Sequence, residues 1–291
     1  MTASETRTAQ GGALYVVATP IGNLEDITIR AAQTLAQASV IAAEDTRHTR
    51  ILLDHLGIAR PRLMALHEHN ETRQIPSVLR MLHEGAQVAL VSDAGTPLIS
   101  DPGYRLVSTA REQGLNVFTI PGPSAVTAAL SVSGLPTDRF VFEGFLPGRA
   151  TARRARLETL SHDTRTLVLF ESPRRIRDTI DDVSMIFGAD RPLALCRELT
   201  KRFESVRRGS AAQVAAILHS EPDECRGEMV VVVGGVEKAP VSAEIDEALL
   251  LDQLADVLPP RVASEVAARL TGGRKNAYYK RILQRAGTHR Q

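Results

Sequence analysis

The chain has 291 residues, of which 43% are hydrophobic and 24% are charged, and its formal net charge is +1. This is the composition of a globular protein with room for two ordinary domains, and the near-neutral charge excludes a polycation. The N-terminus lacks the apolar segment of a signal peptide, and no apolar run approaches membrane-spanning length. We therefore expect a cytoplasmic protein without a membrane partner.

Short apolar runs alternate with helix-like runs between residues 14 and 120. The predicted strands are 14–18, 40–45, 62–68, 88–93 and 115–120, and the predicted helices are 29–38, 49–57, 74–85 and 104–114. Continuously apolar strands separated by helices indicate a parallel sheet that helices cover on both faces. The sequence therefore predicts a parallel α/β lobe over residues 13–122.

A second lobe is predicted over residues 123–237, with strands at 140–145, 166–171, 193–199, 203–209 and 228–235. The connection between the third and the fourth of these strands is short, which favours an antiparallel pair and hence a mixed α/β sheet. Residues 234–247 are typical of a linker. Beyond them, helices at 249–258, 260–273 and 276–287 predict a small C-terminal helical domain, residues 248–291, with Pro260 near one helix start and Gly272 after its end.

Polar and turn residues follow every predicted strand of the first lobe. These segments are TPIGNLED (19–26), EDTRHTR (44–50), HEHNE (67–71), DAGTPLISDPG (93–103) and PGPSA (121–125). In an open parallel sheet, ligands bind in the crevice beyond the carboxyl ends of the strands. The sequence therefore predicts a ligand site along this edge.

Several common kinds of site are disfavoured. The chain has no GxxxxGK[ST], no GxGxxG after its first strand, no GxSxG and no HExxH. Cys196 and Cys225 form no CxxC pattern, so no zinc site or disulfide framework is expected. His67 and His69 leave two interpretations open, a metal site or ordinary surface polarity. The remaining profile is a ligand without phosphate, bound largely by the backbone.

Long motifs carry a resemblance to a known family. They are ATPIGNLEDITIRA, AAEDTRHTR, HEHNE, LVSDAGTPLISDPG, PGPSAVTAALSVSGLPTDRFVFEGFLP, LFESPRR, RELTKRFE and GEMVVVVGG. Together they closely resemble the tetrapyrrole-methylase-like, class III S-adenosylmethionine methyltransferases. More narrowly, they resemble the branch that methylates the ribose 2′-oxygen of a cytidine in bacterial 16S ribosomal RNA. The resemblance covers residues 13–237, and the tail is similar to that branch's helical domain. TPIGNLED departs from the GxGPGD-like loop of the tetrapyrrole enzymes, which puts a porphyrinoid substrate in doubt.

The resemblance implies S-adenosylmethionine as the cofactor, 16S RNA or the 30S subunit as the partner, and a homodimer. Gly95 would let the backbone approach the cofactor closely, and Pro97 would stiffen the loop. Asp93 has two readings, a partner of the cofactor's positive charge or a cap of the turn. Phe170, Leu199 and Met229 would close over the adenosine or form plain core. The implied cofactor residues are Pro20, Asp93, Ala94, Gly95, Thr96, Ile99, Ser100, Ser124, Ala125, Phe170, Leu199 and Met229.

A ribose hydroxyl is a weak acid, so its methylation calls for a general base within hydrogen-bond reach. The candidates at strand ends are Glu44, Asp45, Glu198 and Lys201, with His67 and Glu68 as further ones. Each has a structural alternative: Glu44 and Asp45 suit a helix N-terminus, and Glu198 and Lys201 an ion pair at the sheet edge. No metal is expected, because the thioether is already a good leaving group.

RNA contacts are expected from arginines after the strands of the second lobe, because arginine suits phosphate. The alternative is a solvated basic face, and a GC-rich coding sequence would also favour arginine. A non-catalytic RNA-binding protein and a tetrapyrrole methyltransferase remain the competing functions. The tail's basic run, with Tyr278 and Tyr279, suits either RNA or a partner subunit. The candidate RNA contacts are Arg149, Arg153, Arg154, Arg174, Arg175, Arg207 and Lys275, with Arg156 and Arg208 as further ones.

Overall fold

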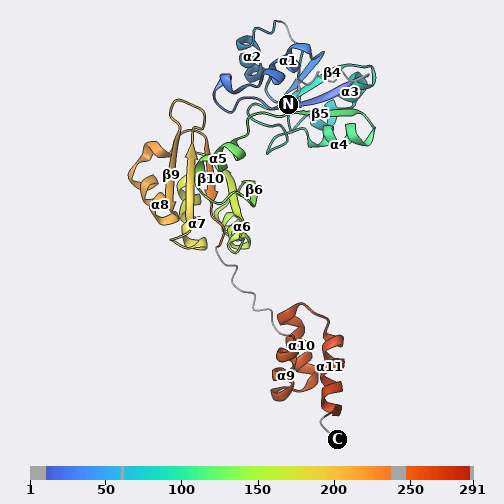
Figure 1. Cartoon of the computed structure of the whole chain (residues 1–291), viewed down its shortest axis with the longest axis vertical. Helices are drawn as coiled ribbons and strands as arrows, with labels where there is room; N and C mark the ends of the chain where they lie inside the picture. The colour runs from blue at the N-terminus through green and yellow to red at the C-terminus, as the bar shows by residue number, and fades with distance from the viewer. Residues whose placement is uncertain (1–10, 60–61, 237–246, 289–291) are drawn as a thin grey trace. The chain divides into compact units, whose positions relative to one another are not determined.

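The computed structural model describes residues 11–59, 62–236 and 247–288. The chain forms two compact units, Met1–Gly235 and Val236–Gln291. The first unit holds two five-stranded sheets, and the described part of the second is helical (Figure 1). The expected linker, 234–247, lies mostly outside the described residues. The expected domain limits at 122/123 and 248 stay predictions.

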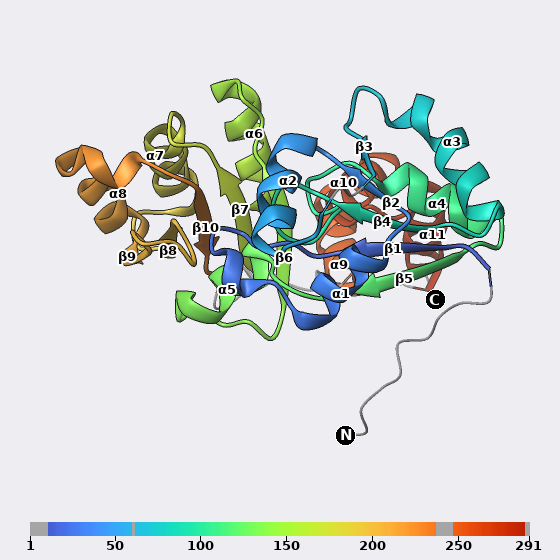
Figure 2. The same cartoon turned by 90° about the horizontal axis from the view of Figure 1, so that it is seen from above.

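The first sheet is entirely parallel, with the strand order β3-β2-β4-β1-β5, as the sequence predicted. Helices α1 and α2 cover one face, and α3 and α4, which lie side by side, cover the other (Figure 2). The strands are β1 (Ala13–Val17), β2 (Val40–Ala43), β3 (Leu63–Ala65), β4 (Gln87–Val91) and β5 (Asn116–Ile120). The helices are α1 (Ile29–Gln37), α2 (Thr46–His55), α3 (Glu71–His83) and α4 (Tyr104–Glu112), with a 3₁₀ turn, η1 (Leu24–Asp26), before α1.

Strand β3 is shorter than the predicted strand 62–68. The Asn70 side chain turns the chain, because its Oδ1 accepts a hydrogen bond from His67 N at 2.9 Å. The same amide group donates to Ala65 O at 3.1 Å. This turn ends the strand before His67, so HEHNE forms the entry to α3 and not a strand end.

The second sheet is mixed, as predicted, with the strand order β6-β7-β10-β8-β9. Only β6 and β7 are parallel neighbours, and the other pairs are antiparallel. The strands are β6 (Phe140–Phe145), β7 (Thr166–Glu171), β8 (Pro192–Arg197), β9 (Ser205–Ser210) and β10 (Met229–Val233). The helices are α5 (Ala125–Ser133), α6 (Ala150–Leu160), α7 (Ile176–Phe187) and α8 (Ala211–Ser220), with a 3₁₀ turn, η2 (Pro222–Cys225), before β10.

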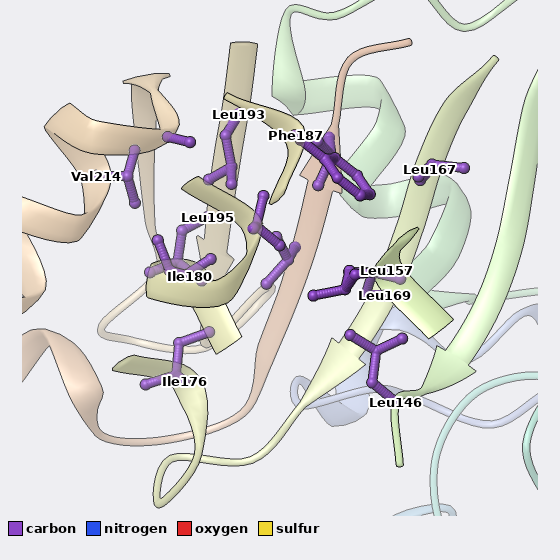
Figure 3. Close-up of a cluster of buried hydrophobic side chains, with 14 of the residues drawn as sticks. Leu146, Leu157, Leu167, Leu169, Ile176, Ile180, Phe187, Leu193, Leu195 and Val214 are labelled. Carbon is purple, nitrogen blue, oxygen red and sulfur yellow. The ribbon is translucent and has the colours of Figure 1, made fainter. Parts of the chain in front are cut away.

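The second sheet buries both of its faces. Helix α5 packs on the face that carries Val168, Val230 and Val232. Helices α6, α7 and α8 pack on the other face, where Leu167, Leu169 and other large apolar side chains fill the space (Figure 3). Each such side chain, fully removed from water, contributes about 1.5–3 kcal/mol to folding. The sheet is therefore a firm base for the loops at its ends.

The C-terminal unit contains α9 (Glu247–Val257), α10 (Pro260–Thr271) and α11 (Lys275–Thr288). Pro260 opens α10, and Gly272 closes it in the left-handed conformation, φ 72°. Tyr278 is buried, and its hydroxyl lies 2.8 Å from Thr271 Oγ1 and donates to Glu247 Oε1 at 2.8 Å. Tyr278 therefore belongs to the small core of this unit and offers no surface to RNA. No helix of the part of the chain that the structure describes is both long and apolar enough to cross a bilayer.

Candidate functional site

A cavity of about 350 Å³ lies between the carboxyl edge of the first sheet and the second sheet. Its size is within the range of small-molecule sites. Almost all of the residues that the sequence marked for the cofactor line this cavity. They are Asp93, Ala94, Gly95, Thr96, Ile99, Ser100, Ser124, Ala125, Phe170, Leu199 and Met229.

Pro20 is the exception among the expected cofactor residues. It lines a separate hollow of about 190 Å³ together with His48, Ile51 and Asp93. The chain turns away from the cavity directly after β1, and Ile21, the next residue, faces it instead. The structure therefore does not place Pro20 in the lining of the cofactor cavity, and its contact with the cofactor stays a prediction.

The loop after β4, residues 92–103, folds back onto the ends of β1 and β5. Gly95 and Thr19 exchange two backbone hydrogen bonds, of 2.9 and 3.0 Å, and Thr96 Oγ1 donates to Pro123 O at 3.0 Å. Leu98 and Ser100 have φ of 75° and 68°, a conformation that costs a non-glycine residue of order 1–3 kcal/mol. Strain of this kind is typical of ligand-binding segments, and here the hydrogen bonds to Thr19 and Pro123 hold the loop in place against its cost.

Three carboxylates gather where this loop meets the end of β2. Glu44, Asp93 and Asp101 all line the cavity. Asp93 Oδ1 accepts a hydrogen bond from Asp45 N at 2.9 Å, and its Oδ2 lies 3.1 Å from His48 Nδ1. A group of acids that nothing basic in the cavity lining neutralises makes a negative pole, which attracts a cation.

The pKa values of two of these acids reflect their confinement. Burial raises the pKa of the Asp101 carboxyl to about 6, and the charges of Glu44 and Asp93 add to this while a hydrogen bond from Ser92 opposes it. Burial also raises the pKa of Glu44. Perturbed carboxyl groups in a cleft are typical of functional sites. Asp101 was not among the site residues predicted from the sequence, although its acidic side chain stands in the same loop as DAGTP.

Asp45 is a helix cap and does not line the cavity. Its side chain accepts a hydrogen bond from Arg47 N at 2.8 Å and pairs with the Arg47 guanidinium at 2.6 Å. These bonds hold the pKa of Asp45 well below its usual range. Of the two interpretations of this residue, the structure supports the cap at the start of α2.

Glu198 and Lys201 form an ion pair of 3.0 Å, and Lys201 Nζ also lies 3.1 Å from Glu228 Oε2. Burial opposes the charge of Glu198, but hydrogen bonds from Glu228 N and Lys201 lower its pKa overall. Burial likewise works against the charge of Lys201, but the two glutamates raise its pKa overall. Neither group is suited to take up a proton, and neither lines the cavity. For both residues the structure therefore supports the interpretation as an ion pair at the sheet edge.

The Lys201 segment joins the two lobes. A Cβ built on Gly22 would lie 2.5 Å from Lys201 Cγ, so a larger residue at this position would require the Lys201 side chain to move. Thr200 Oγ1 accepts a hydrogen bond from Asn23 N at 3.2 Å. These contacts bring the loop after β8 against the loop after β1 and close one side of the cavity.

The second lobe lines the cavity with apolar side chains and few charges. Phe170, Leu199 and Met229 are there as expected, and Phe145 and Cys196 are further members. Burial raises the pKa of the Cys196 thiol to about 12, so it is a neutral, apolar group. Both cysteines are unpaired. Glu171 is also in the lining, with its side chain fully buried and bonded to Arg175 at 3.0 Å and Thr179 at 2.7 Å.

Most of the expected RNA contacts are engaged within the protein. Arg153 is only 3% exposed and pairs with Asp182 at 2.7 Å, so its assignment to RNA was wrong. Its side chain points inward because α6 packs against α7, which carries Asp182. Arg154 shares Asp182, Arg156 pairs with Glu143, Arg175 with Glu171, Arg207 with Glu224, and Lys275 with Glu265 in the C-terminal unit.

Arg149 and Arg174 differ from these residues. Both are exposed, and neither side chain has a hydrogen bond or an ion pair within residues 11–59, 62–236 and 247–288. Arg149 follows β6, and Arg174 follows β7, at the edge where Phe145, Phe170 and Glu171 line the cavity. These two arginines are the best placed of the expected set to meet an anion.

No cluster of three or more His, Cys, Asp or Glu side chains in the described segments could hold a metal ion. The rings of His67 and His69 lie edge to face, with their centroids 6.1 Å apart. Neither histidine lines the cavity.

The family model of the tetrapyrrole (corrin/porphyrin) methylases matches residues 13–215. Three similar relatives, all named ribosomal RNA small subunit methyltransferase I, come from Haemophilus influenzae, Mesorhizobium japonicum and Pseudomonas aeruginosa. The first is 45% identical over 92% of this chain and 95% of its own length. The second is 50% identical, over 94% and 92% of the two chains, and the third 47%, over 95% and 98%.

Solved structures with the same fold are more distant in sequence. The uroporphyrin-III-C-methyltransferase from Thermus thermophilus superposes with a TM-score of 0.52 and 22% identity, over 77% of this chain and 94% of the other. A diphthine synthase superposes with a TM-score of 0.58 and 16% identity, over 77% and 90%. At these identities the likeness shows the shared fold.

Proposed function

The chain belongs to the tetrapyrrole (corrin/porphyrin) methylase family, and on that premise we propose that it methylates the ribose 2′-oxygen of a cytidine in 16S ribosomal RNA. Its cofactor is S-adenosylmethionine, the methyl donor of this family. The observation that carries the proposal is the meeting of the expected cofactor residues in one acid-lined cavity. RNA as the substrate is supported by relatives that share 45–50% of their residues with nearly the whole chain.

The residues of the cavity fit this cofactor. S-adenosylmethionine has positive charges and no phosphate, and the lining has the acids Glu44, Asp93, Asp101, Glu171 and Glu228 and neither arginine nor lysine. Gly95 lines the cavity with a φ of 79°, and because it has no side chain its backbone can approach a ligand closely. The apolar wall of Phe170, Leu199 and Met229 suits an adenosine.

In this arrangement the loop after β4 and Ser124 would hold the methionine end, and Asp93 would face its positive charge. When bound, S-adenosylmethionine supplies a methyl group on a positively charged sulfur, which departs as a neutral thioether. The task of the protein is to position the hydroxyl, and orientation of this kind lowers a barrier by up to roughly 7–11 kcal/mol. The loop after β4, which is strained and held by two backbone hydrogen bonds to Thr19, provides a rigid support for this positioning.

We assign to Asp101 the role of the general base that accepts the proton of the ribose hydroxyl. Its carboxyl lines the cavity, whereas Asp45, Glu198 and Lys201 do not. With a pKa of about 6, Asp101 is ionised at neutral pH and is still a stronger base than an ordinary aspartate. Glu44 is the remaining competitor, because it lines the same side of the cavity.

The substrate is tested by transfer of a tritiated methyl group from S-adenosylmethionine. We expect label in 30S subunits or naked 16S RNA, and reverse transcription at limiting nucleotides should stop at one cytidine. Transfer to a porphyrinoid but not to RNA would overturn the proposal. RNA binding without any calorimetric signal for S-adenosylmethionine would identify a non-catalytic RNA-binding protein instead.

The resemblance also predicts a homodimer in the cytoplasm, and both stay predictions. Sedimentation equilibrium of the full chain, with and without S-adenosylmethionine, would establish the oligomeric state. A monomer under both conditions would remove the dimer from the proposal.

A further inference from the structure

Strand β6 carries an irregularity at the point where it reaches the cavity. Phe142 pairs with Val168 and Gly144 with Leu169, so Glu143 is one extra residue in β6. Gly144 has a φ of 64°, and a Cβ on it would lie 3.0 Å from Ser100 Oγ. A bulge of this kind re-aims the side chains that follow it, and bulges are common beside active sites.

The bulge decides which way Phe145 points. Side chains alternate between the faces of a regular strand, so if β6 ran without a bulge, Phe145, three residues after Phe142, would lie on the opposite face. With it, Phe142 and Phe145 share the face of Val168 and Phe170. Glu143 takes the other face, where Arg156 of α6 holds its carboxylate at 2.6 Å.

The result is a row of three aromatic rings that ends in solvent. Phe142 lies against Phe170, with the centroids 4.9 Å apart, and Phe145 lies against Phe170 at 5.7 Å. Phe145 is 58% exposed, although it lines the cavity. An exposed ring held from behind by a second ring is a ready surface for stacking, and it loses little entropy when a ligand ring meets it.

The surrounding charges indicate what that ligand ring belongs to. Arg149 and Arg174 stand on the two loops that flank Phe145 and Phe170, and Arg175 Nη2 joins these loops by donating to Leu146 O at 2.8 Å. The interior of the cavity is acidic, with Glu44, Asp93 and Asp101. A phosphate is therefore attracted to the rim and repelled from the interior, whereas a neutral base or sugar can enter.

We propose that the exposed ring of Phe145 is the stacking platform for the nucleobase of the nucleotide whose ribose is methylated, with Arg149 and Arg174 binding the adjoining phosphates. The assignment rests on the proposed RNA substrate. Proteins that recognise single-stranded RNA commonly stack its unpaired bases on aromatic side chains. Phe145 is in this sense a substrate-positioning residue.

The experiment compares Phe145→Leu with Phe140→Leu, a matched control. Phe140 begins the same strand and is 43% exposed, but it does not line the cavity. Phe145→Tyr keeps the ring and serves as the rescue variant. The substrate is an RNA fragment with pyrrolocytidine at the mapped target position, whose fluorescence falls when it stacks. S-adenosylhomocysteine is added so that no transfer takes place.

We expect the wild type, Phe145→Tyr and Phe140→Leu to quench the fluorescence, and Phe145→Leu to leave it unquenched. With unmodified RNA, Phe145→Leu should lower kcat/KM for RNA about 10-fold, the effect of losing one base stack. Calorimetry should show the same affinity for S-adenosylmethionine in all four proteins.

Two results would overturn the assignment while leaving the proposed function intact. One is wild-type quenching and kinetics in Phe145→Leu. The other is a parallel loss of S-adenosylmethionine affinity, which would place the ring in the cofactor site. A wild-type protein that methylates no ribosomal RNA would overturn the proposed function, and this inference with it.

Discussion

The two sheets present different chemistry to the same cavity. The first sheet is parallel, so the loops after β1, β2, β4 and β5 meet at one edge, and they contribute backbone and carboxylates. The second sheet is mixed, and it contributes the side chains at the ends of β6, β7 and β8 and at the start of β10. One edge thus suits a cation held by main-chain atoms, and the other suits rings and, at its rim, phosphates.

The largest effect is expected from a variant that blocks cofactor binding at the edge of the first sheet. Gly95→Leu places a side chain against Ile21, where a Cβ is already 3.3 Å from Cγ2, so we expect S-adenosylmethionine binding to be abolished. Calorimetry measures this directly. Gly114→Leu is the control, since Gly114 has a similar φ of 71° and nothing within 4 Å of its Cβ. Gly114→Leu should lose stability but keep binding. Equal binding in both variants would refute the cofactor assignment.

The second-largest effect is expected from a variant at the same edge that lowers the rate of methyl transfer but leaves cofactor binding intact. Asp101→Asn removes the proposed proton acceptor, and we expect kcat to fall about 100-fold or more while S-adenosylmethionine still binds. The wild-type rate should rise with pH through about 6 and then level off, and Asp101→Asn should lack this step. Glu44→Gln is the rival variant. A greater loss there, with the pH step gone, would move the role to Glu44.

The third effect sharpens the contrast with the second edge. Arg149→Gln with Arg174→Gln should weaken RNA binding about 10-fold in moderate salt, because two phosphate contacts are lost. The slope of log K against log salt should become shallower by about 2. The matched control, Arg73→Gln with Arg80→Gln, removes two exposed arginines of α3 in the first lobe. Identical slopes in both double variants would show that the rim arginines do not meet RNA.

The smallest effect concerns stability. The pKa of Asp101 is about 6 in the fold, against 3.8 for an ordinary aspartate, so folding favours its protonated form. That stabilisation is complete below 3.8 and is lost as the pH rises through about 6. Asp101→Asn should therefore melt at a higher temperature than the wild type at pH 8, by of order 1–3 °C. At pH 3 the two proteins should melt at the same temperature. Differential scanning fluorimetry at both pH values measures this difference. If Asp101→Asn melts at the same or a lower temperature than the wild type at pH 8, the ionised Asp101 carboxylate does not destabilise the fold.

The first edge was largely predictable from local patterns. The apolar runs and the turn residues after them predict parallel strands with loops at one end, and DAGTPLISDPG stands out among these loops by its glycines, prolines and acids. Asp101 was missed because its burial depends on Glu44 and Asp93, which reach it from the ends of other strands. The correct function of Asp45 as a cap was one of two interpretations that spacing alone could not separate.

The second edge was hardly predictable. Phe170, Leu199 and Met229 came from the family resemblance, and nothing local distinguishes them from core residues. Arg153 and Arg149 stand four residues apart in one basic run, yet one is buried against Asp182 on α7 and the other is exposed. A helix in isolation does not tell which of its faces another helix will cover.

By itself the sequence determined the alternation of strands and helices, the mixed character of the second sheet and the family, because apolar periodicity and motif order are local properties of the chain. Only the tertiary structure decided which acids share a cavity, which arginines are already paired and which way Phe145 points. Those outcomes depend on contacts between residues far apart in the chain, and on a single extra residue in β6 whose effect on side-chain direction shows only once β7 lies beside it.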